Sequence, residues 1–127
     1  MPLVTIVTVL ALIQYIVQGV RVGQARQRYG VEAPATTGHA IFERHFRVHQ
    51  NTLEQLLIFL PGMWLFGWYV RWGIAALLGV VFIVARFIYE RAYVADPNQR
   101  TTGFVATAIV NGVLLIGALI GALVHLL

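Results

Sequence analysis

The chain has 127 residues, of which 59% are apolar and only 11% are charged. An ordinary soluble domain carries about 25% charged residues, so this composition argues against a water-soluble globular protein. The absence of cysteine excludes a thiol nucleophile or a thiolate metal site supplied by the chain itself. A membrane-spanning helix needs roughly 20 mostly apolar residues. We therefore expect one membrane domain over residues 1–127 that contains four spans.

The hydropathy pattern predicts four helices joined by one loop and two short turns. The predicted helices cover residues 3–28, 42–69, 74–94 and 102–127. The first connection is the longest, because Gly30, Pro34 and Gly38 all lie within it. Pro61 falls inside the second helix, where a membrane helix tolerates it if its neighbours satisfy the freed carbonyl. The expected fold is an all-α membrane protein, a bundle of four transmembrane helices.

The charges are distributed unevenly between the two ends of this bundle. All nine basic residues are arginine, and the net charge is +4. Arg71 alone belongs to the end that holds the termini, and eight arginines lie near the first and third connections: Arg21, Arg26, Arg28, Arg44, Arg47, Arg86, Arg91 and Arg100. Basic residues are retained on the cytoplasmic side of a membrane. We therefore expect a multi-pass protein whose first and third connections are cytoplasmic and whose termini are not, in a bacterial inner membrane rather than an endomembrane.

Two helices carry polar residues on one face at the arginine-rich end. In the second helix the spacing i, i+4, i+7 aligns Arg47, Asn51 and Glu54. In the third helix the aligned residues are Arg86, Tyr89, Glu90 and Tyr93. One interpretation is an internal network in which Arg47 or Arg86 forms an ion pair with Glu54 or Glu90. The other is a site for an anionic or zwitterionic ligand, because ionisable groups at membrane depth are functional candidates.

A metal site is not expected. His45 and His49 are four residues apart and Glu54 follows, which is a spacing that metal ligands adopt. The pattern lacks a glutamate between the histidines in the position that zinc peptidases use, and no second cluster completes it. Histidines at the membrane interface are the better interpretation.

The run of residues 42–54, FERHFRVHQNTLE, resembles the signature of the MAPEG family, the membrane-associated proteins in eicosanoid and glutathione metabolism. The likeness extends over the whole chain. It includes the four-span layout and Thr36-Thr37-Gly38 before the signature. It also includes a later motif formed by Ala85, Arg86, Tyr89, Tyr93 and Arg100. The chain departs from the pattern at Gln55, where several members of the family have tyrosine.

The resemblance implies a homotrimer that binds glutathione between neighbouring subunits at the cytoplasmic end. By motif match, the residues that would hold glutathione are Arg26, Arg47, Asn51, Glu54, Tyr89 and Tyr93. Arg100 matches the arginine that stabilises the glutathione thiolate, and Arg86, Glu90 and His49 are candidates for supporting roles. A guanidinium near the sulfur favours the thiolate, which is the reactive nucleophile. The implied co-substrate is glutathione, and no metal is implied.

Two functions remain open on these grounds. The leading hypothesis is a membrane-bound glutathione transferase. One form of this hypothesis adds a glutathione-dependent peroxidase activity. Its thiolate would attack a lipophilic electrophile or a lipid hydroperoxide that arrives from the bilayer. The alternative is a non-catalytic lipid-binding or scaffold protein of the same fold; a transporter or assembly factor has weaker support. The expected partners are glutathione, these lipophilic substrates, membrane lipids and further copies of the chain, and no nucleic acid.

Overall fold

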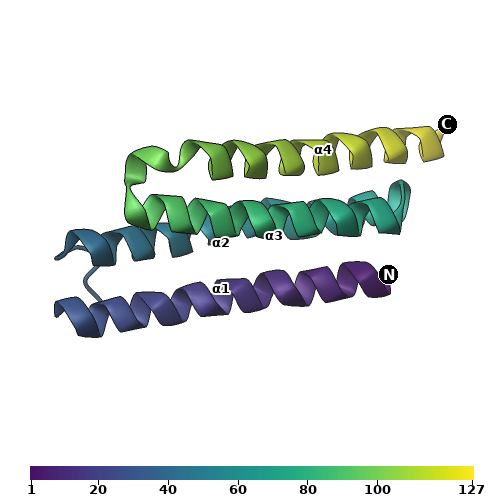
Figure 1. Ribbon diagram of the computed structural model, residues 1–127. Coiled ribbons are helices and arrows are strands. Elements are labelled where there is room, and N and C mark those ends of the chain that lie inside the picture. The colour runs from purple at the N-terminus through teal and green to yellow at the C-terminus, as the bar shows by residue number, and fades with distance from the viewer.

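The computed structural model describes all 127 residues as four long helices and one short 3-10 helix. The elements are α1 (Pro2–Tyr29), α2 (Ala40–Tyr69), α3 (Trp72–Ala95), η1 (Pro97–Gln99) and α4 (Thr101–Leu126). Both chain ends lie at one end of the molecule, and the first and third connections lie at the other (Figure 1). The predicted all-helical fold with four long helices is confirmed, and each helix begins and ends within two residues of the range expected.

Residues of the first connection bring α1 and α2 side by side. α1 ends at Tyr29 because Gly30 adopts a left-handed conformation (φ 68°) and the Val31 amide donates to the Arg26 carbonyl. α2 begins after His39, whose Nδ1 accepts from the Ile41 amide at 3.1 Å. The His39 ring also stacks on Tyr29, with ring centroids 3.9 Å apart. The loop is thus fastened at both ends, which places the polar start of α2 beside the basic end of α1.

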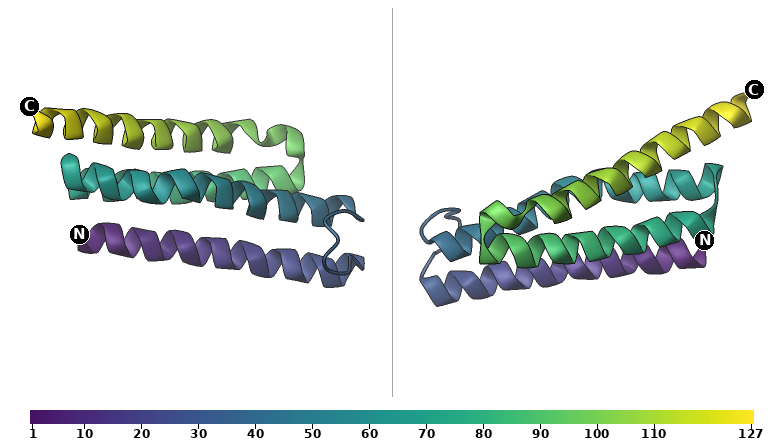
Figure 2. Two further views of the ribbon diagram at one scale, coloured as in Figure 1. Left: turned by 180° about the vertical axis from the view of Figure 1, so that it is seen from behind. Right: turned by 45° about the horizontal axis from the view of Figure 1, so that its top comes forward.

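The α2 and α3 pair forms the middle of the bundle, with α1 on one side of it and α4 on the other (Figure 2). Phe59 of α2 and Phe82 of α3 stack at its centre, with ring centroids 3.8 Å apart and both side chains fully buried. Two hydrogen bonds attach α1 to the α2 and α3 pair. The Trp64 indole donates to Thr8 at 3.0 Å, and the Gln14 amide donates to the Ile83 carbonyl at 3.0 Å. Toward its C-terminus α4 diverges from the other helices (Figure 2).

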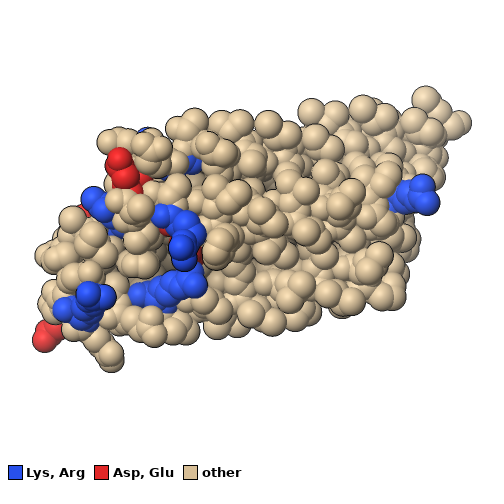
Figure 3. Space-filling model, in the orientation of Figure 1, with Lys and Arg blue, Asp and Glu red and all other residues tan.

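The outer surface is suited to lipid along most of its length. Large apolar side chains are widely exposed; Leu57 is 71% exposed and Ile116 is 62% exposed. Charged side chains gather at one end of the molecule, and a single basic group marks the opposite end (Figure 3). A surface of this kind needs a hydrocarbon environment, because a soluble monomer rarely exposes a large continuous apolar patch.

Three of the helices are long and apolar enough to cross a membrane: α1, α3 and the segment Pro97–Leu126 that includes α4. α2 is not among them, although it has 30 residues. The reason is its first half, where Glu43, Arg44, Arg47 and Glu54 interrupt the apolar sequence. α2 therefore differs from the other helices in the polar composition of its first half. This polar segment forms part of the site described below.

Gly103 allows α4 to approach α3 closely. A Cβ atom at this position would lie 2.7 Å from the backbone N and Cα of Tyr89. Real Cβ atoms essentially never approach backbone this closely, so any larger residue must push the two helices apart. The close approach sets the position of Tyr89 relative to the start of α4.

We predict that Gly103→Ala lowers the unfolding temperature of the protein in detergent, because overpacking of a tight contact costs about 1–3 kcal/mol. Gly112→Ala is the matched control, since no atom lies within 4 Å of a Cβ built at Gly112 in the same helix. Circular dichroism during heating measures both variants. Equal stability of the two would show that the close contact at Gly103 is not required.

Candidate functional site

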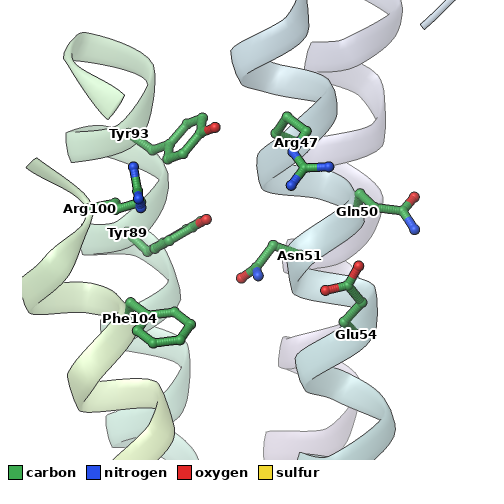
Figure 4. Close-up of a pocket in the computed structure, with 8 residues that line it drawn as sticks. All are labelled: Arg47, Gln50, Asn51, Glu54, Tyr89, Tyr93, Arg100 and Phe104. Atoms are coloured by element: carbon green, nitrogen blue, oxygen red, sulfur yellow. The ribbon is translucent and has the colours of Figure 1, made fainter. Parts of the chain in front are cut away.

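A cavity of about 290 Å³ opens between α2 and the ends of α3 and α4 that meet at the third connection. The size is at the lower end of the range for small-molecule sites, which is roughly 300–1,000 Å³. Its lining residues are Arg47, Gln50, Asn51, Glu54, Tyr89, Tyr93, Arg100 and Phe104. The side chains of α2 face those of α3 and α4 across it (Figure 4). The structure thus brings six of the predicted site residues together in one cavity.

The α2 side of the cavity follows from helical spacing alone. Arg47, Asn51 and Glu54 lie on one face of the helix, as their spacing predicted, and Gln50 shares that face. The Arg47 guanidinium and the Glu54 carboxylate are exposed in the single chain and form neither a hydrogen bond nor an ion pair within it. Two opposite charges therefore stand free on the same wall, about two helical turns apart.

The other wall combines two tyrosines with an arginine. Tyr89 and Tyr93 of α3 are stacked with ring centroids 5.6 Å apart. Arg100 precedes α4 and donates to the Pro97 carbonyl at 3.0 Å. η1 fixes this arrangement, since the Asp96 side chain accepts from the Asn98 amide at 3.0 Å and turns the chain back toward α4. The Arg100 guanidinium consequently lies beside the tyrosine rings (Figure 4).

Behind the cavity, the Arg86 guanidinium is fully buried and joins three helices. It donates to Asn51 Oδ1 at 2.8 Å and to Thr52 Oγ1 at 2.9 Å on α2, and to Thr107 Oγ1 at 3.5 Å on α4. It also lies 4.2 Å from the centroid of the Tyr89 ring. Asn51 Oδ1 already accepts from Arg86, and the amide nitrogen of Asn51 has no partner in the chain and can donate to a ligand.

Of the two interpretations of the polar faces, the internal ion-pair network of Arg47 or Arg86 with Glu54 or Glu90 does not form in the structure. The chain has one ion pair, between Arg21 of α1 and Glu90 of α3, and neither Arg47 nor Arg86 takes part in it. Arg86 is instead held by the neutral groups of Asn51 and Thr52. Glu54 and Glu90, the acidic residues of the two polar faces, therefore have different surroundings.

Four predicted residues are not part of the cavity lining: Arg86, which lies behind it as described above, and Glu90, His49 and Arg26. Glu90 is directed toward α1 by its ion pair with Arg21. His49 stacks on Tyr15 of α1, with ring centroids 4.2 Å apart. Arg26 donates to the Ala35 carbonyl at 2.7 Å and lies over the Phe42 ring, 4.7 Å from its centroid.

The cavity includes two residues that the sequence interpretation did not select. Gln50 follows Arg47 by three residues and Phe104 follows Arg100 by four, so helical spacing from either arginine could have found them. Gln55, by contrast, faces α4, where its Oε1 accepts from the Asn111 amide at 3.0 Å. Gln55, at which the chain departs from the family pattern, therefore contributes to the packing of α2 against α4.

The electrostatics of the cavity favour an anionic or zwitterionic ligand. Its lining holds two positive groups, Arg47 and Arg100, and one negative group, Glu54, for a net charge of +1. None of the three is in an ion pair. Guanidinium groups bind carboxylates through short, charge-assisted hydrogen bonds, and a free carboxylate binds an ammonium group. The cavity can therefore hold a molecule that has carboxylates at some distance from an amine.

Comparison with known proteins gives the same family that the sequence motifs indicate. The profile of the MAPEG family matches residues 4–120. An uncharacterized protein of Synechocystis sp. is 45% identical over 118 residues, which are 93% of this chain and 86% of that protein. Human microsomal glutathione S-transferase 2 is 38% identical over 95% of this chain and 80% of its own length. Leukotriene C4 synthase of Bos taurus is 34% identical over 95% of this chain and 81% of its own length.

The match to the family covers nearly all of the chain, and it includes both walls of the cavity. The relatives named above are similar over four fifths or more of their own length. A partial or local likeness would not extend through all four helices in this way. The chain belongs to the MAPEG family.

Proposed function

We propose that this protein is a membrane-bound glutathione transferase that binds glutathione in the cavity and holds its sulfur as a thiolate. The observation that carries the proposal is the set of three free charges, Arg47, Glu54 and Arg100, around one small cavity. Glutathione has two carboxylates and one ammonium group, so its net charge of −1 complements the +1 of the lining. The relatives named as a glutathione S-transferase and a leukotriene C4 synthase support this assignment.

Each wall of the cavity has a separate task in this proposal. Arg47 binds a carboxylate and Glu54 binds the ammonium group, while Asn51 and the hydroxyls of Tyr89 and Tyr93 hold the peptide by hydrogen bonds. Arg86 keeps Asn51 and Tyr89 in place from behind. Positioning of this kind converts an encounter between two molecules into a reaction within one complex.

Arg100 supplies the chemistry by favouring the charged form of the sulfur. A free thiol has a pKa of about 8.5, so most of it is protonated at neutral pH. A guanidinium within reach stabilises the thiolate. The thiolate attacks an electrophilic carbon, a C–S bond forms, and the leaving group departs with its electron pair. With a lipid hydroperoxide, it attacks the terminal oxygen. The O–O bond breaks to give an alcohol and a sulfenic acid, which a second glutathione converts to disulfide and water.

In this proposal the protein assembles as a homotrimer, and a neighbouring copy of the chain completes the cavity. Glu54 and Arg47 are exposed in the single chain, and an exposed charge at membrane depth is costly. Arg26, which the family pattern assigns to glutathione, lies outside the cavity of its own chain. A neighbouring subunit that contributes Arg26 would both cover these charges and supply the missing guanidinium.

The cavity would face the cytoplasm. Its end of the molecule carries eight of the nine arginines, and such an excess is typical of the cytoplasmic side. We propose that α2 forms the fourth span, because its apolar second half runs beside the other helices (Figure 2). The membrane would be a bacterial inner membrane, where cytoplasmic glutathione and lipophilic substrates dissolved in the bilayer can both reach the cavity.

We predict that glutathione bound to the wild-type protein shows the ultraviolet absorption of a thiolate at neutral pH and that Arg100→Ala abolishes it. The loss follows from removal of the positive charge next to the sulfur. Ultraviolet difference spectroscopy of the purified protein measures the band. Arg71→Ala, which removes an arginine at the opposite end, should leave it intact. If wild-type protein binds no glutathione and shows no band, the lipid-binding scaffold becomes the better hypothesis.

We predict that Glu54→Gln weakens glutathione binding about tenfold or more, because loss of one charge-assisted hydrogen bond costs about 1.5–3 kcal/mol. An analogue of glutathione without its amino group should bind the wild-type protein and the variant equally. Isothermal titration calorimetry measures all four combinations, and Glu32→Gln is the control for loss of an acid elsewhere. Equal weakening for both ligands would show that Glu54 does not contact the amine.

We predict that subunits that carry Arg26→Ala and subunits that carry Arg100→Ala restore each other when they assemble together. In a site shared between subunits, an equal mixture gives about one quarter of the sites with both arginines intact. The Arg100→Ala homotrimer alone should show no thiolate band, and the Arg26→Ala homotrimer should show the band only at a higher glutathione concentration than the wild type. Titration of the band against glutathione in the co-purified mixture measures the recovered fraction. No recovery in mixed trimers would mean that both arginines act within one chain.

A further inference from the structure

A second hollow lies away from the candidate site, between α1, α2 and α3, and it shares no lining residue with that site. Its volume is about 360 Å³, and it is lined by Arg21, His45, Glu90, Arg91, Val94 and Ala95. A smaller adjoining cavity of about 130 Å³ shares Arg21 and His45 and adds Arg28. Basic side chains gather around a hollow at the charged end of the molecule (Figure 3). We call these two adjoining cavities the basic groove.

The charges of the basic groove are incompletely neutralised. Arg21 forms an ion pair with Glu90, whose side chain is 7% exposed. Arg28 and Arg91 form no hydrogen bond and no ion pair within the chain. Their guanidinium groups lie near aromatic rings of their own helices, 5.6 Å from the centroid of Tyr29 and 5.7 Å from that of Phe87. With three arginines against one glutamate, the groove carries a charge of +2 when His45 is neutral.

The groove lies at the depth of lipid headgroups. The apolar part of α1, residues 3–20, has a length of about 27 Å at 1.5 Å per residue, which nearly spans the hydrocarbon core. Arg21 is the next residue. Just below the arginines, exposed apolar side chains continue along both helices. Val17 is one turn from Arg21 on α1, and Phe87 is one turn from Arg91 on α3, and they are 41% and 50% exposed.

We propose that the basic groove binds the phosphate of an anionic glycerophospholipid, with Arg28 and Arg91 as its charged ligands. Guanidinium groups match phosphate oxygens in geometry and charge. The apolar side chains of Val17 and Phe87 then contact the first part of the acyl chains. This apolar contact favours a lipid over a free anion, because a soluble phosphate would use only the polar half of the groove. The Arg21–Glu90 ion pair forms the fixed base of the site.

The test compares lipids that differ only in the charge of the headgroup. Wild-type protein in phosphatidylcholine nanodiscs is supplied with phosphatidylglycerol, which exchanges with the phosphatidylcholine. Native mass spectrometry then counts the molecules of each lipid that stay bound to the protein. One basic residue near the surface contributes about 1 kcal/mol, so each arginine should give about fivefold preference for phosphatidylglycerol. We expect Arg91→Gln to reduce the preference for phosphatidylglycerol about fivefold. The double variant Arg28→Gln/Arg91→Gln should lose most of the preference. These variants leave the buried Glu90 with its partner Arg21.

Arg71→Gln is the matched control, because Arg71 is an exposed arginine without a hydrogen bond or ion pair at the opposite end. It should retain the preference. The unfolding temperature in phosphatidylcholine alone verifies that each variant is folded, and this measurement does not depend on glutathione. The proposal is overturned if the wild-type protein shows no preference, or if Arg71→Gln and Arg91→Gln reduce it equally. It is also overturned if inorganic phosphate displaces the lipid at equal concentration, which would indicate a site for soluble anions.

Discussion

The buried guanidinium of Arg86 is the interaction on which the charged end of this bundle depends. A positive charge without solvent exposure and without an acidic partner is costly, the more so near a bilayer. It is accommodated because α2 and α4 bring neutral acceptors to it from two sides, at Asn51, Thr52 and Thr107. The three helices must therefore keep their register. That same register sets Asn51 and Tyr89 on the walls of the cavity.

Two acidic residues on neighbouring helices have different roles for reasons of packing. Glu90 of α3 is buried and neutralises Arg21, which joins α1 to the bundle. Glu54 of α2 is exposed and free of any partner, so its charge remains available to a ligand. The candidate glutathione site and the basic groove are thus separate surfaces at one end of the molecule, and α3 contributes residues to both.

Spacing along single helices predicted much of the cavity. The positions of Arg47, Asn51 and Glu54 on one face of α2 follow from the period of the helix, and so do those of Tyr89 and Tyr93 on α3. The same rule could have added Gln50. It could not separate the contacts of Arg86 and Glu90, which are four residues apart on α3. Arg86 contacts α2 and α4, whereas Glu90 contacts α1.

By itself, the sequence determined the class of protein, the four helices, and the end of the bundle that carries the charges. These properties depend on hydropathy and local turn residues, which act over a few neighbouring positions. Only the tertiary structure decided which charges neutralise one another and which stay free for a ligand. Contacts such as the Arg21–Glu90 ion pair join residues that lie far apart in the sequence, in this case 69 positions. Their formation depends on how the helices are rotated against one another, which packing at contacts such as Gly103 against Tyr89 decides.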